Sequence, residues 1–421
     1  MEKLHVLIEG SLAGALVQDD SGRLAFSYAP GYNGVPLSLS MPIGNEAYGD
    51  KQMRSYLFGL LPDAEDVRRN LAAEFGVSPR NPFALLQYIG LDCPGAVQIC
   101  DDDGLAMVVN REEKLVEIDE HGIAERLREV RGGDSRWVAD AEHWSLGGRQ
   151  SKFALRNEGG RWFCCEGCAP TTHILKPGIQ GLDWQALNEF LCLRTAALCG
   201  IRAARCEYQV FEDQPAIVVQ RYDRVRLDGM VRRVHQEDFC QMLGCLPEHK
   251  YAEEGGPSAP DVICMLKRTG GDASANIRAF IEMLLFNYLT AAPDAHAKNY
   301  SVLLGRDRAV LAPLYDVASV LPYRDGVTGL RLAMGVAGEN RTACLSRRRI
   351  ARFAESNNLG SYGLDSAEMA GMLERLAVKI PQAMRHVASE HAGVFGMEEL
   401  AGRMVAKAEQ LCKLSMERLN G

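Results

Sequence analysis

Alternating apolar and polar positions occupy much of the first hundred residues. Leu37, Leu39 and Met41 alternate with small or polar neighbours, which predicts a half-buried strand over residues 36–42. Pro82 heads the apolar stretch 82–89, and because proline suits the first turn of a helix, this stretch is expected to be helical. Strand-like and helical segments side by side predict an α+β unit.

Beyond residue 143 the pattern favours a β-hairpin. A glycine-containing loop, 144–152, precedes two strand-like runs, 153–156 and 161–164, which are joined by the turn 157–160. A further strand is expected at 172–177, where Lys176 is its last polar residue.

A helix and a strongly apolar strand follow. Asp183 is a suitable N-cap, and apolar residues keep helical spacing from Leu187 to Leu198, before Gly200. The apolar run within residues 216–223 predicts that this segment is a strand. From His235 onward helical patterns dominate, interrupted by a Gly-, Glu- and Pro-rich loop over 248–260.

Composition narrows the class of protein. The 421 residues are 47% apolar and 24% charged with a net charge of −8, which excludes a disordered chain and a nucleic-acid-binding surface that works through charge alone. The first ten residues lack the apolar core of a signal peptide, and the apolar run 283–289 is too short to span a membrane. With an odd number of cysteines, thirteen, we expect reduced thiols in the cytoplasm.

A zinc site is not expected. Cys165 and Cys168 have ligand spacing, but no second pair stands nearby, and the nine histidines never pair at ligand spacing. We interpret residues 165–168 as a hairpin turn.

The order of polar residues along the chain is that of a protein kinase. A glycine-bearing loop is followed by Lys176, by an acid in a helix, Glu189, by an apolar strand and then by a helical half. In that half, Asp294 and Asn299 have the D-x-x-x-x-N spacing of kinase catalytic loops, in which the aspartate orients the attacking hydroxyl and the asparagine binds Mg²⁺. A predicted hairpin, 301–316, returns Asp316 beside Asn299 as a second metal ligand.

Each feature alone also has an ordinary structural explanation. Asp294 and Asn299 can simply close a turn, and Lys176 and Glu189 can be solvated charges on a strand and a helix. The loop 145–148 lacks both G-x-G-x-x-G and the Walker pattern. The joint order of the features is what favours a kinase.

These residues resemble the HipA family of serine/threonine kinases, the toxins of bacterial type II toxin–antitoxin modules. The most specific segments are 172–176, 188–189, 294–299 and 311–317, and segments 38–42, 59–63 and 92–97 resemble the N-terminal region of the family. The resemblance implies an α+β, two-lobed kinase-like fold with an additional N-terminal α/β subdomain and a mainly helical C-terminal lobe. We expect the subdomain at 1–135, the N-lobe at 136–223 and the C-lobe at 224–421, with residues 131–135 as the first boundary.

The resemblance also implies roles for individual residues. Asp294 is the expected catalytic base, Asn299 and Asp316 the Mg²⁺ ligands, and Ser145 the autophosphorylated serine that switches the kinase off. The expected ATP-binding residues comprise a phosphate contact, the glycine loop, the lining of the nucleotide site and the hinge: Lys176; Ser145, Gly147, Gly148, Arg149 and Gln150; Val97, His296 and Tyr315; Gln220, Tyr222 and Asp223.

The sequence departs from the family in two places. The loop reads Leu-Gly-Gly-Arg-Gln-Ser-Lys over 146–152 where members commonly have Val-Ala-Gly-Ala-Gln-Glu-Lys, so Ser151 is an alternative phosphorylation site to Ser145. The hinge has Gln220 where glutamate is common, which matters less because backbone groups read adenine there.

The expected function is a kinase toxin that phosphorylates an aminoacyl-tRNA synthetase, in this family glutamyl-tRNA synthetase, and so blocks translation and arrests growth. Its expected partner is a helix-turn-helix antitoxin of HipB type, through which it would contact DNA indirectly. Two alternatives are a small-molecule kinase of the aminoglycoside type and a pseudokinase co-repressor. The basic run 347–349 reads as a solvated helix start and is left without a function.

Overall fold

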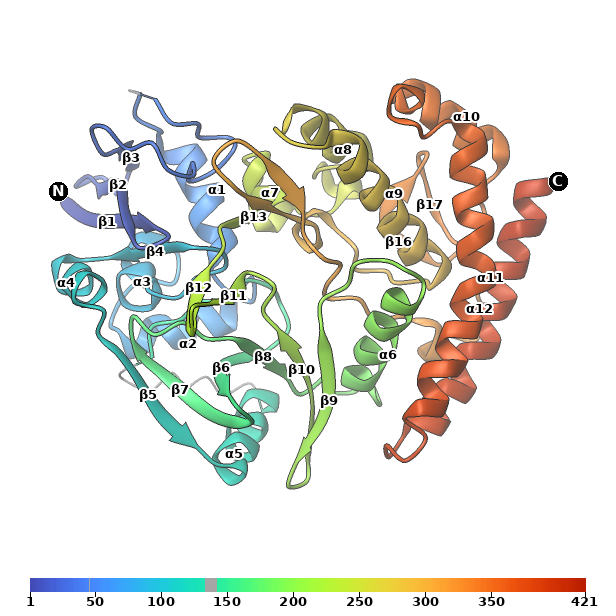
Figure 1. Ribbon diagram of the computed structural model, residues 1–421, viewed down its shortest axis with the longest axis horizontal. Coiled ribbons are helices and arrows are strands. Elements are labelled where there is room, and N and C mark those ends of the chain that lie inside the picture. The colour runs from blue at the N-terminus through green and yellow to red at the C-terminus, as the bar shows by residue number, and fades with distance from the viewer. Residues whose placement is uncertain (45, 133–141) are drawn as a thin grey trace. The chain divides into compact units, whose positions relative to one another are not determined.

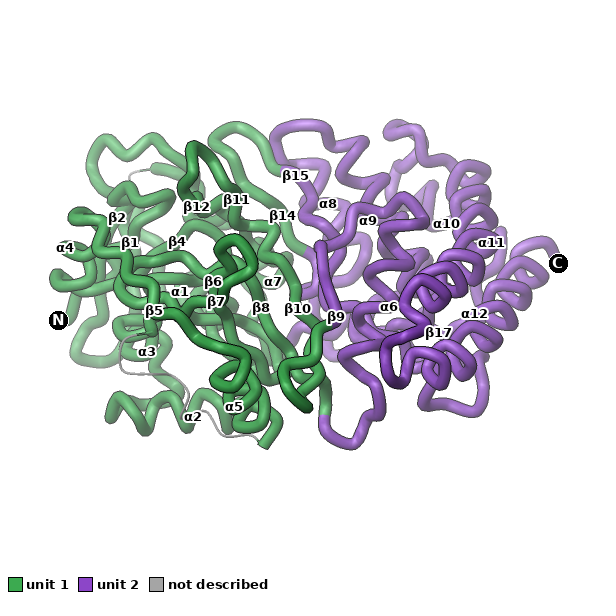
Figure 2. The backbone as a smooth tube through the Cα atoms, turned by 60° about the horizontal axis from the view of Figure 1, so that its bottom comes forward, with its two compact units in different colours: residues 1–179, 209–248, 301–309 green, residues 180–208, 249–300, 310–421 purple. Residues whose placement is uncertain are grey.

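The chain divides into two compact units, shown in Figure 2. The computed structural model describes residues 1–44, 46–132 and 142–421. Unit 1 comprises residues 1–179, 209–248 and 301–309, and unit 2 comprises 180–208, 249–300 and 310–421. The expected boundary at 131–135 falls mostly on residues 133–141, outside the described residues.

Unit 1 begins with a four-stranded antiparallel sheet in the order β3-β2-β1-β4. β1 pairs on both sides, and its residues from Leu4 to Ile8 are buried. The strands and helices of this region are β1 Glu2–Ile8, β2 Ser11–Gln18, β3 Leu24–Tyr28, α1 Asp50–Leu60, α2 Glu65–Glu74, α3 Pro82–Ile89, β4 Val97–Cys100 and α4 Asp102–Asn110.

The predicted helix at 82–89 is confirmed, and the predicted strand at 36–42 is wrong. Pro82 begins α3 after the cap Asn81, whose side chain accepts a hydrogen bond from the Ala84 amide. Residues 36–42 form a turn with a single bridge between Ser38 and Met41. Leu37, Ser38 and Met41 are buried while Leu39 is half-buried, so the alternating sequence pattern does not correspond to the two faces of a strand.

The second sheet has the order β5-β7-β6-β8-β10-β9. Helix α5 packs against it, and Ile123 and Leu127 of α5 share a buried core with Phe153, Leu155 and Leu175. The elements are β5 Glu113–Ile118, α5 Glu120–Arg131, β6 Phe153–Glu158, β7 Arg161–Gly167, β8 His173–Lys176, β9 Cys206–Phe211 and β10 Gln214–Gln220.

The predicted hairpin and strands in this sheet are confirmed, with one correction. β6 and β7 pair across the turn 158–161. Residues 165–167 form the end of β7, where Cys165 pairs with Leu115 of β5, so the interpretation of 165–168 as a hairpin turn is wrong. β7 is longer than its apolar core because β5 supplies a second pairing partner.

Six short elements follow the hinge in unit 1. β11 and β12 form a hairpin, and β13 pairs with β14, the strand that follows the predicted catalytic loop. β15 is the third strand of that sheet and continues into unit 2. The bounds are β11 Arg224–Leu227, β12 Met230–Arg233, β13 Gln236–Asp238, α7 Phe239–Met242, β14 Ser301–Leu304 and β15 Ala309–Leu311.

Unit 2 is mainly helical. Helix α11 contacts α6, α9, α10 and α12, and it runs beside α12 in Figure 1. The elements are α6 Gln185–Leu198, α8 Ala259–Arg268, α9 Ala273–Leu289, β16 Arg331–Val336, β17 Glu339–Arg341, α10 Arg347–Ser356, α11 Ser366–Glu390 and α12 Met397–Asn420. Short 3₁₀ turns occur at Pro247–His249, Ala252–Glu254, Ala297–Asn299, Leu321–Tyr323 and Leu359–Tyr362.

Two helix starts in unit 2 bear on the sequence predictions. α6 begins after Trp184, which has a left-handed backbone, so Asp183 is not its N-cap. Arg347, Arg348 and Arg349 open α10 and are exposed, which confirms the solvated helix start. Within the described residues, no helix is long and apolar enough to cross a membrane.

Candidate active site

The predicted catalytic loop follows α9 in unit 2. α9 is buried around most of its surface, which fixes the point from which the loop departs, and Ala291 turns the chain with a φ of +47°. Asn299 Nδ2 donates to the Asp294 carbonyl oxygen at 2.7 Å, and the Asn299 and His296 amides donate to His296 and Asp294 carbonyls at 2.9 and 2.8 Å. The five-residue spacing therefore closes a compact loop.

The Asp294 carboxylate is accessible to solvent. Its side chain is 61% exposed, and its Oδ1 accepts a hydrogen bond from the Tyr251 hydroxyl at 2.9 Å. His296 Nε2 lies 3.7 Å from the same oxygen, and the His296 ring is buried edge-to-face against Tyr251, with centroids 5.1 Å apart. The loop thus presents an accessible carboxylate whose orientation is set by two neighbouring side chains.

Asp316 lies on a segment held against the same loop. The Tyr315 hydroxyl donates to the Lys298 carbonyl at 2.7 Å, directly before Asn299. Asp316 has a φ of +57°, a left-handed conformation that is rare for a residue other than glycine. Such a conformation persists only where the surroundings hold it, and it is frequent at functional sites.

Contacts on both sides of Asp316 supply that support. Leu314 exchanges backbone hydrogen bonds of 2.8 Å with Arg202 and Ala204. On the other side, Asn188 of α6 bonds both the amide and the carbonyl of Ser319, at 3.0 and 2.7 Å. Asn188 of the motif segment 188–189 thus helps to position the segment that carries Asp316.

The predicted metal ligands offer the oxygens that Mg²⁺ prefers. The side-chain nitrogen of Asn299, Nδ2, donates a hydrogen bond to the Asp294 carbonyl oxygen. The side-chain oxygen of Asn299, Oδ1, is therefore the atom that can face a cation. Asp316 adds a carboxylate, and one amide, one carboxylate and phosphate oxygens suit a cation that keeps several waters. In the described chain, no three His, Cys, Asp or Glu side chains cluster closely enough to form a metal site by themselves.

The predicted glycine loop of unit 1 is packed inward. Ser145 is 2% exposed, and its Oγ donates to the Leu60 carbonyl at 2.7 Å. Further along, the Gly148 carbonyl accepts from the Asp63 amide at 2.9 Å, and Lys152 Nζ donates to Gly147 O at 2.9 Å. The loop therefore packs against segment 59–63, which resembles the N-terminal region of the family.

Two glycines and three polar residues occupy the second half of the loop. Gly148 has a φ of +102°, which only glycine adopts readily, and a Cβ there would lie 2.6 Å from Lys152 Nζ. Arg149 is exposed, while Gln150 and Ser151 are half-buried. Since Ser145 is buried and Ser151 is not, the two predicted phosphorylation sites differ in accessibility.

Lys176 and Glu189 are buried in their respective units. Lys176 ends β8, pairs with Ile217 of β10 and is 6% exposed. Glu189 lies in α6 and is 1% exposed. The alternative that both are solvated charges is therefore wrong, because a buried ionisable group requires a specific reason to be there.

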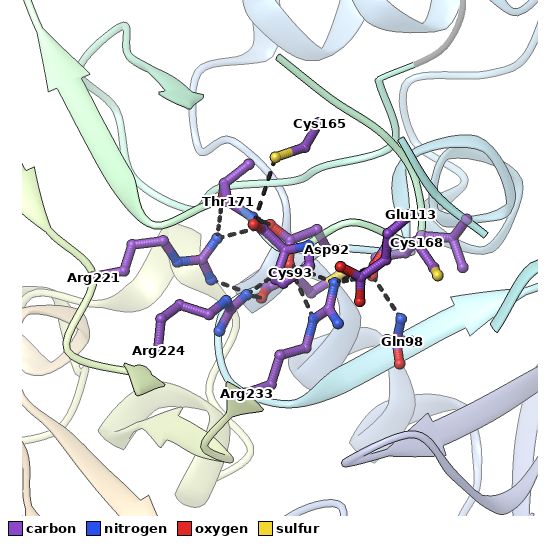
Figure 3. A network of polar contacts seen from close by, with 12 residues as sticks. Asp92, Cys93, Gln98, Glu113, Cys165, Cys168, Thr171, Arg221, Arg224 and Arg233 are labelled. Atoms are coloured by element: carbon purple, nitrogen blue, oxygen red, sulfur yellow. Dashed lines mark hydrogen bonds and ion pairs between the residues drawn. The ribbon is translucent and has the colours of Figure 1, made fainter. Parts of the chain in front are cut away.

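The predicted hinge lies at the centre of a buried ionic network, drawn in Figure 3. Arg221 and Arg224, on either side of Tyr222 and Asp223, are both bonded to Asp92, and Arg224 also lies 2.9 Å from Asp223. Burial alone would raise the pKa of Asp92, but Arg224, Arg221 and Arg233 outweigh it and hold this pKa well below its usual range. Asp92 is therefore ionised.

Asp223 connects the hinge to the strand that begins with Val97. Its Oδ2 accepts from the Gly95 amide at 2.6 Å and from Arg221 Nη2 at 2.9 Å. Burial would raise the pKa of Asp223, but Arg221 and Arg224 lower it overall. Val97 is fully buried at the start of β4, two residues after Gly95. The contact between Asp223 and Gly95 therefore joins the hinge to the segment that carries Val97, one of the predicted lining residues.

The remaining hinge residues are more accessible. Gln220 is exposed, and Tyr222 is half-buried with its hydroxyl bonded to Gln236. A cavity of about 380 Å³ lies beside the hinge in unit 1, lined by Gln220, Arg221, Arg224, Thr172 and His173 among others.

Sequence reasoning missed Tyr251, Asp92, Arg224 and Arg233. Tyr251 stands in a loop without periodicity, and nothing in its surroundings marks it. Asp92 lies in segment 92–97, whose resemblance to the family pointed to this region. Its arginine partners, however, are 129 to 141 positions away along the chain.

Comparison with known proteins identifies what this chain is similar to. The family model described as "HipA-like C-terminal domain" matches residues 144–384, and the one described as "HipA N-terminal domain" matches residues 4–100. A protein named as a kinase, Y4mE of Sinorhizobium fredii, is 36% identical over 329 residues, covering 76% of this chain and 78% of its own.

Two comparisons involve Shewanella oneidensis. Its serine/threonine-protein kinase toxin HipA is 28% identical over 368 residues, covering 84% of this chain and 81% of the toxin. A solved structure from this organism, described as a toxin–antitoxin system of HipA, HipB and operator DNA, matches with a TM-score of 0.81 at 26% identity, over 98% of this chain and 99% of that one. The predicted kinase-like α+β fold is confirmed by this match.

Proposed function

This chain belongs to the HipA family of serine/threonine kinase toxins, and we propose that it transfers the γ-phosphoryl group of ATP, with Mg²⁺, to a protein substrate. The observation that carries the proposal is the loop 294–299. It combines an exposed carboxylate, oriented by Tyr251, with an amide oxygen on Asn299 and a neighbouring segment that bears Asp316.

In the proposed reaction, Asp294 orients the substrate hydroxyl and takes its proton. The hydroxyl oxygen forms a bond to Pγ as the bond from Pγ to the bridging β–γ oxygen breaks, and ADP leaves. Asn299 and Asp316 hold Mg²⁺, which neutralises charge on the phosphates. Positioning and charge stabilisation are the whole of the catalysis in this class of reaction.

We assign nucleotide binding to the residues that the family resemblance indicates. Lys176 contacts the phosphates, together with the loop residues Ser145, Gly147, Gly148, Arg149 and Gln150. Backbone groups of Gln220 and Tyr222 read adenine, Asp223 lies near the ribose, and Val97, His296 and Tyr315 line the site.

Ser145 is the proposed autophosphorylation site. A phosphoryl group there would place acceptor oxygens against the Leu60 carbonyl, which is itself an acceptor 2.7 Å from Ser145 Oγ. The group also adds roughly −1.5 to −2 charge units. The loop would therefore have to leave its buried position, which removes the phosphate contacts and switches the kinase off.

The proposed substrate is an aminoacyl-tRNA synthetase, in particular glutamyl-tRNA synthetase, whose inactivation blocks translation and causes growth arrest. The proposed partner is a helix-turn-helix antitoxin of HipB type, which would bring the chain to DNA. The Shewanella complex, which contains HipA, HipB and operator DNA, supports that partner. Both partners would place the protein in the cytoplasm.

The test is incubation with Mg²⁺ and γ-labelled ATP, alone and with a bacterial lysate, followed by mass spectrometry of labelled sites. We expect label on Ser145 and on a synthetase in the wild type and none with Asp294→Asn. Ser145→Ala should lose its own label and keep the substrate label. Asp325→Asn, which changes an exposed aspartate in the same unit, is the matched control and should behave as wild type. Absence of any label from a folded protein would overturn the proposal.

A further inference from the structure

Asp92 contacts the Ser145 loop through its main chain. Its amide donates to the His143 carbonyl at 3.1 Å, and its carbonyl accepts from the Ser145 amide at 3.2 Å, which makes a parallel bridge between Asp92 and Trp144. These two bonds fix the residues on either side of Trp144. The Asp92 backbone is thus one anchor of the loop, in addition to its contacts with Leu60 and Asp63.

The Asp92 carboxylate contacts the hinge. Its Oδ2 accepts from Arg221 Nη1 at 3.2 Å and from the Thr171 hydroxyl at 2.7 Å. Its Oδ1 accepts from Arg224 Nη2 at 2.8 Å and from Arg233 Nε at 3.0 Å. All these groups converge on Asp92 in Figure 3.

The arginines also hold the chain that follows Asp92. Arg221 Nη2 and Arg224 Nη2 donate to the Cys93 carbonyl at 2.9 and 3.0 Å. Arg224 Nη1 donates to the Gly95 carbonyl at 2.8 Å, while Asp223 accepts from the Gly95 amide. Residues 92–95 therefore cannot move far without displacing the hinge.

Charge makes this connection stiff. Within the network, the three guanidinium groups of Arg221, Arg224 and Arg233 face the carboxylates of Asp92 and Asp223. The Asp92, Arg221 and Arg224 side chains are almost completely buried, where an uncompensated charge is costly. The carboxylate cannot turn away while the arginines stay.

We propose that Asp92 is a positioning residue that couples the Ser145 loop to the nucleotide hinge. With Ser145 packed against Leu60, the loop holds the Asp92 backbone, and the Asp92 carboxylate holds Arg221 and Arg224 in the conformation that binds adenine. When the loop leaves, Asp92 loses both backbone partners and the hinge relaxes. Release of the loop then weakens binding of the adenine part of the nucleotide as well as of its phosphates. This inference rests on the proposed function.

The test uses adenosine as the probe, because it has no phosphates for the loop to contact. Ser145→Asp places a carboxylate against the Leu60 carbonyl and should release the loop. We expect it to weaken adenosine binding by about 5–10-fold, measured by titration calorimetry on the full chain. Equal binding to wild type and Ser145→Asp would overturn the inference.

A second set of variants tests the route through Asp92. In an Asp92→Asn background the further effect of Ser145→Asp should fall below about twofold, because the link is already broken. If Asp92→Asn does not fold, Thr171→Val removes the hydroxyl that bonds both the Asp92 carboxylate and Arg221 and keeps the charge of the carboxylate, and it should reduce the effect partially. A full effect in both backgrounds would overturn the route.

Glu237→Gln is the matched control, since Glu237 is buried in the same unit but bonds Ser38 and Leu39 instead of the hinge. It should leave the Ser145→Asp effect unchanged, and a loss of the effect there would count against the assignment to Asp92. Failure of the proposed function would look different: the folded wild type would bind neither adenosine nor ATP.

Discussion

Asp294 in unit 2 and Asp92 in unit 1 carry the same side chain in opposite surroundings. Asp294 is 61% exposed and accepts a hydrogen bond from a neutral tyrosine hydroxyl. Asp92 is 4% exposed and bonds three arginines and a threonine. A carboxylate that is to meet a substrate hydroxyl must be reachable and able to take a proton, whereas one that anchors a hinge must stay ionised and fixed.

A third carboxylate sharpens the comparison. Glu237 is as deeply buried as Asp92, but its carboxylate accepts from the Ser38 hydroxyl at 2.6 Å and the Leu39 amide at 2.8 Å. Burial raises the pKa of Glu237 to about 8, and those two hydrogen bonds offset only part of the rise. Burial alone therefore does not decide the charge of a carboxylate, and the neighbouring cations do.

The largest expected effect is on catalysis. Asp294→Asn should lower the rate of phosphoryl transfer by roughly 10²–10⁴-fold, the usual contribution of a positioned acid or base, with an unchanged melting temperature. The measurement is the initial rate of label transfer together with a thermal melt. A rate within tenfold of wild type would show that Asp294 is not the base.

Asp92→Asn should have its main effect on stability. Removing the charge leaves the buried Arg221 and Arg224 with Asp223 and takes from Arg233 the carboxylate that it pairs with. Breaking a buried ion pair in this way costs about 3–5 kcal/mol. Urea denaturation followed by circular dichroism measures this cost. A cost below about 1 kcal/mol would show that the network tolerates the loss of the Asp92 charge. Asp92 would then not differ from Asp294 in its contribution to stability.

Glu237 should make stability depend on pH in the direction opposite to Asp92. Because the pKa of Glu237 is raised in the folded chain, its contribution is complete below about pH 4.5 and is lost as pH rises through about 8, with a slope of at most about 1.4 kcal/mol per pH unit. Asp92 has a lowered pKa, so its contribution is lost only in strong acid.

The measurement is urea denaturation of wild type and Glu237→Gln between pH 6.5 and 8. Burial lowers the pKa of the nearby His235 to about 4, which gives an opposing slope below about pH 6.5 and none in the chosen window. Asp238 is the other charged neighbour of Glu237. Wild type should lose stability relative to the variant as pH rises, and parallel curves would contradict the assignment.

The smallest effect is expected from Tyr251→Phe. It removes one hydrogen bond to an exposed carboxylate, so the rate of transfer should fall by less than about tenfold, with stability unchanged. Steady-state kinetics across pH would check this, and a loss as large as that of Asp294→Asn would make Tyr251 part of the catalytic machinery.

Local pattern was sufficient for several features. The helix at 82–89, the hairpin after residue 152, the strand ending at Lys176 and the exposed start of α10 all follow from spacing, caps and turn residues. The D-x-x-x-x-N spacing likewise identified a loop that closes on itself, because Asn299 is near Asp294 in sequence as well as in space.

Predictions were wrong where a distant partner decided the outcome. Residues 36–42 alternate like a strand but form a turn, and β7 extends through 165–167 because β5 pairs with it. Asp183 has the chemistry of a cap, yet Trp184 takes that place with a left-handed backbone.

By itself, then, the sequence determined the main elements, the family resemblance and the candidate catalytic residues, since these depend on periodicity and short spacings. Only the tertiary structure decided which charges are buried and what they contact. Lys176, Glu189 and Asp92 look like ordinary surface charges in sequence, but all three are buried. The convergence of Arg221, Arg224 and Arg233 on Asp92 arises from packing between segments more than a hundred residues apart. Desolvation and pairing are properties of that packing, and no local pattern encodes them.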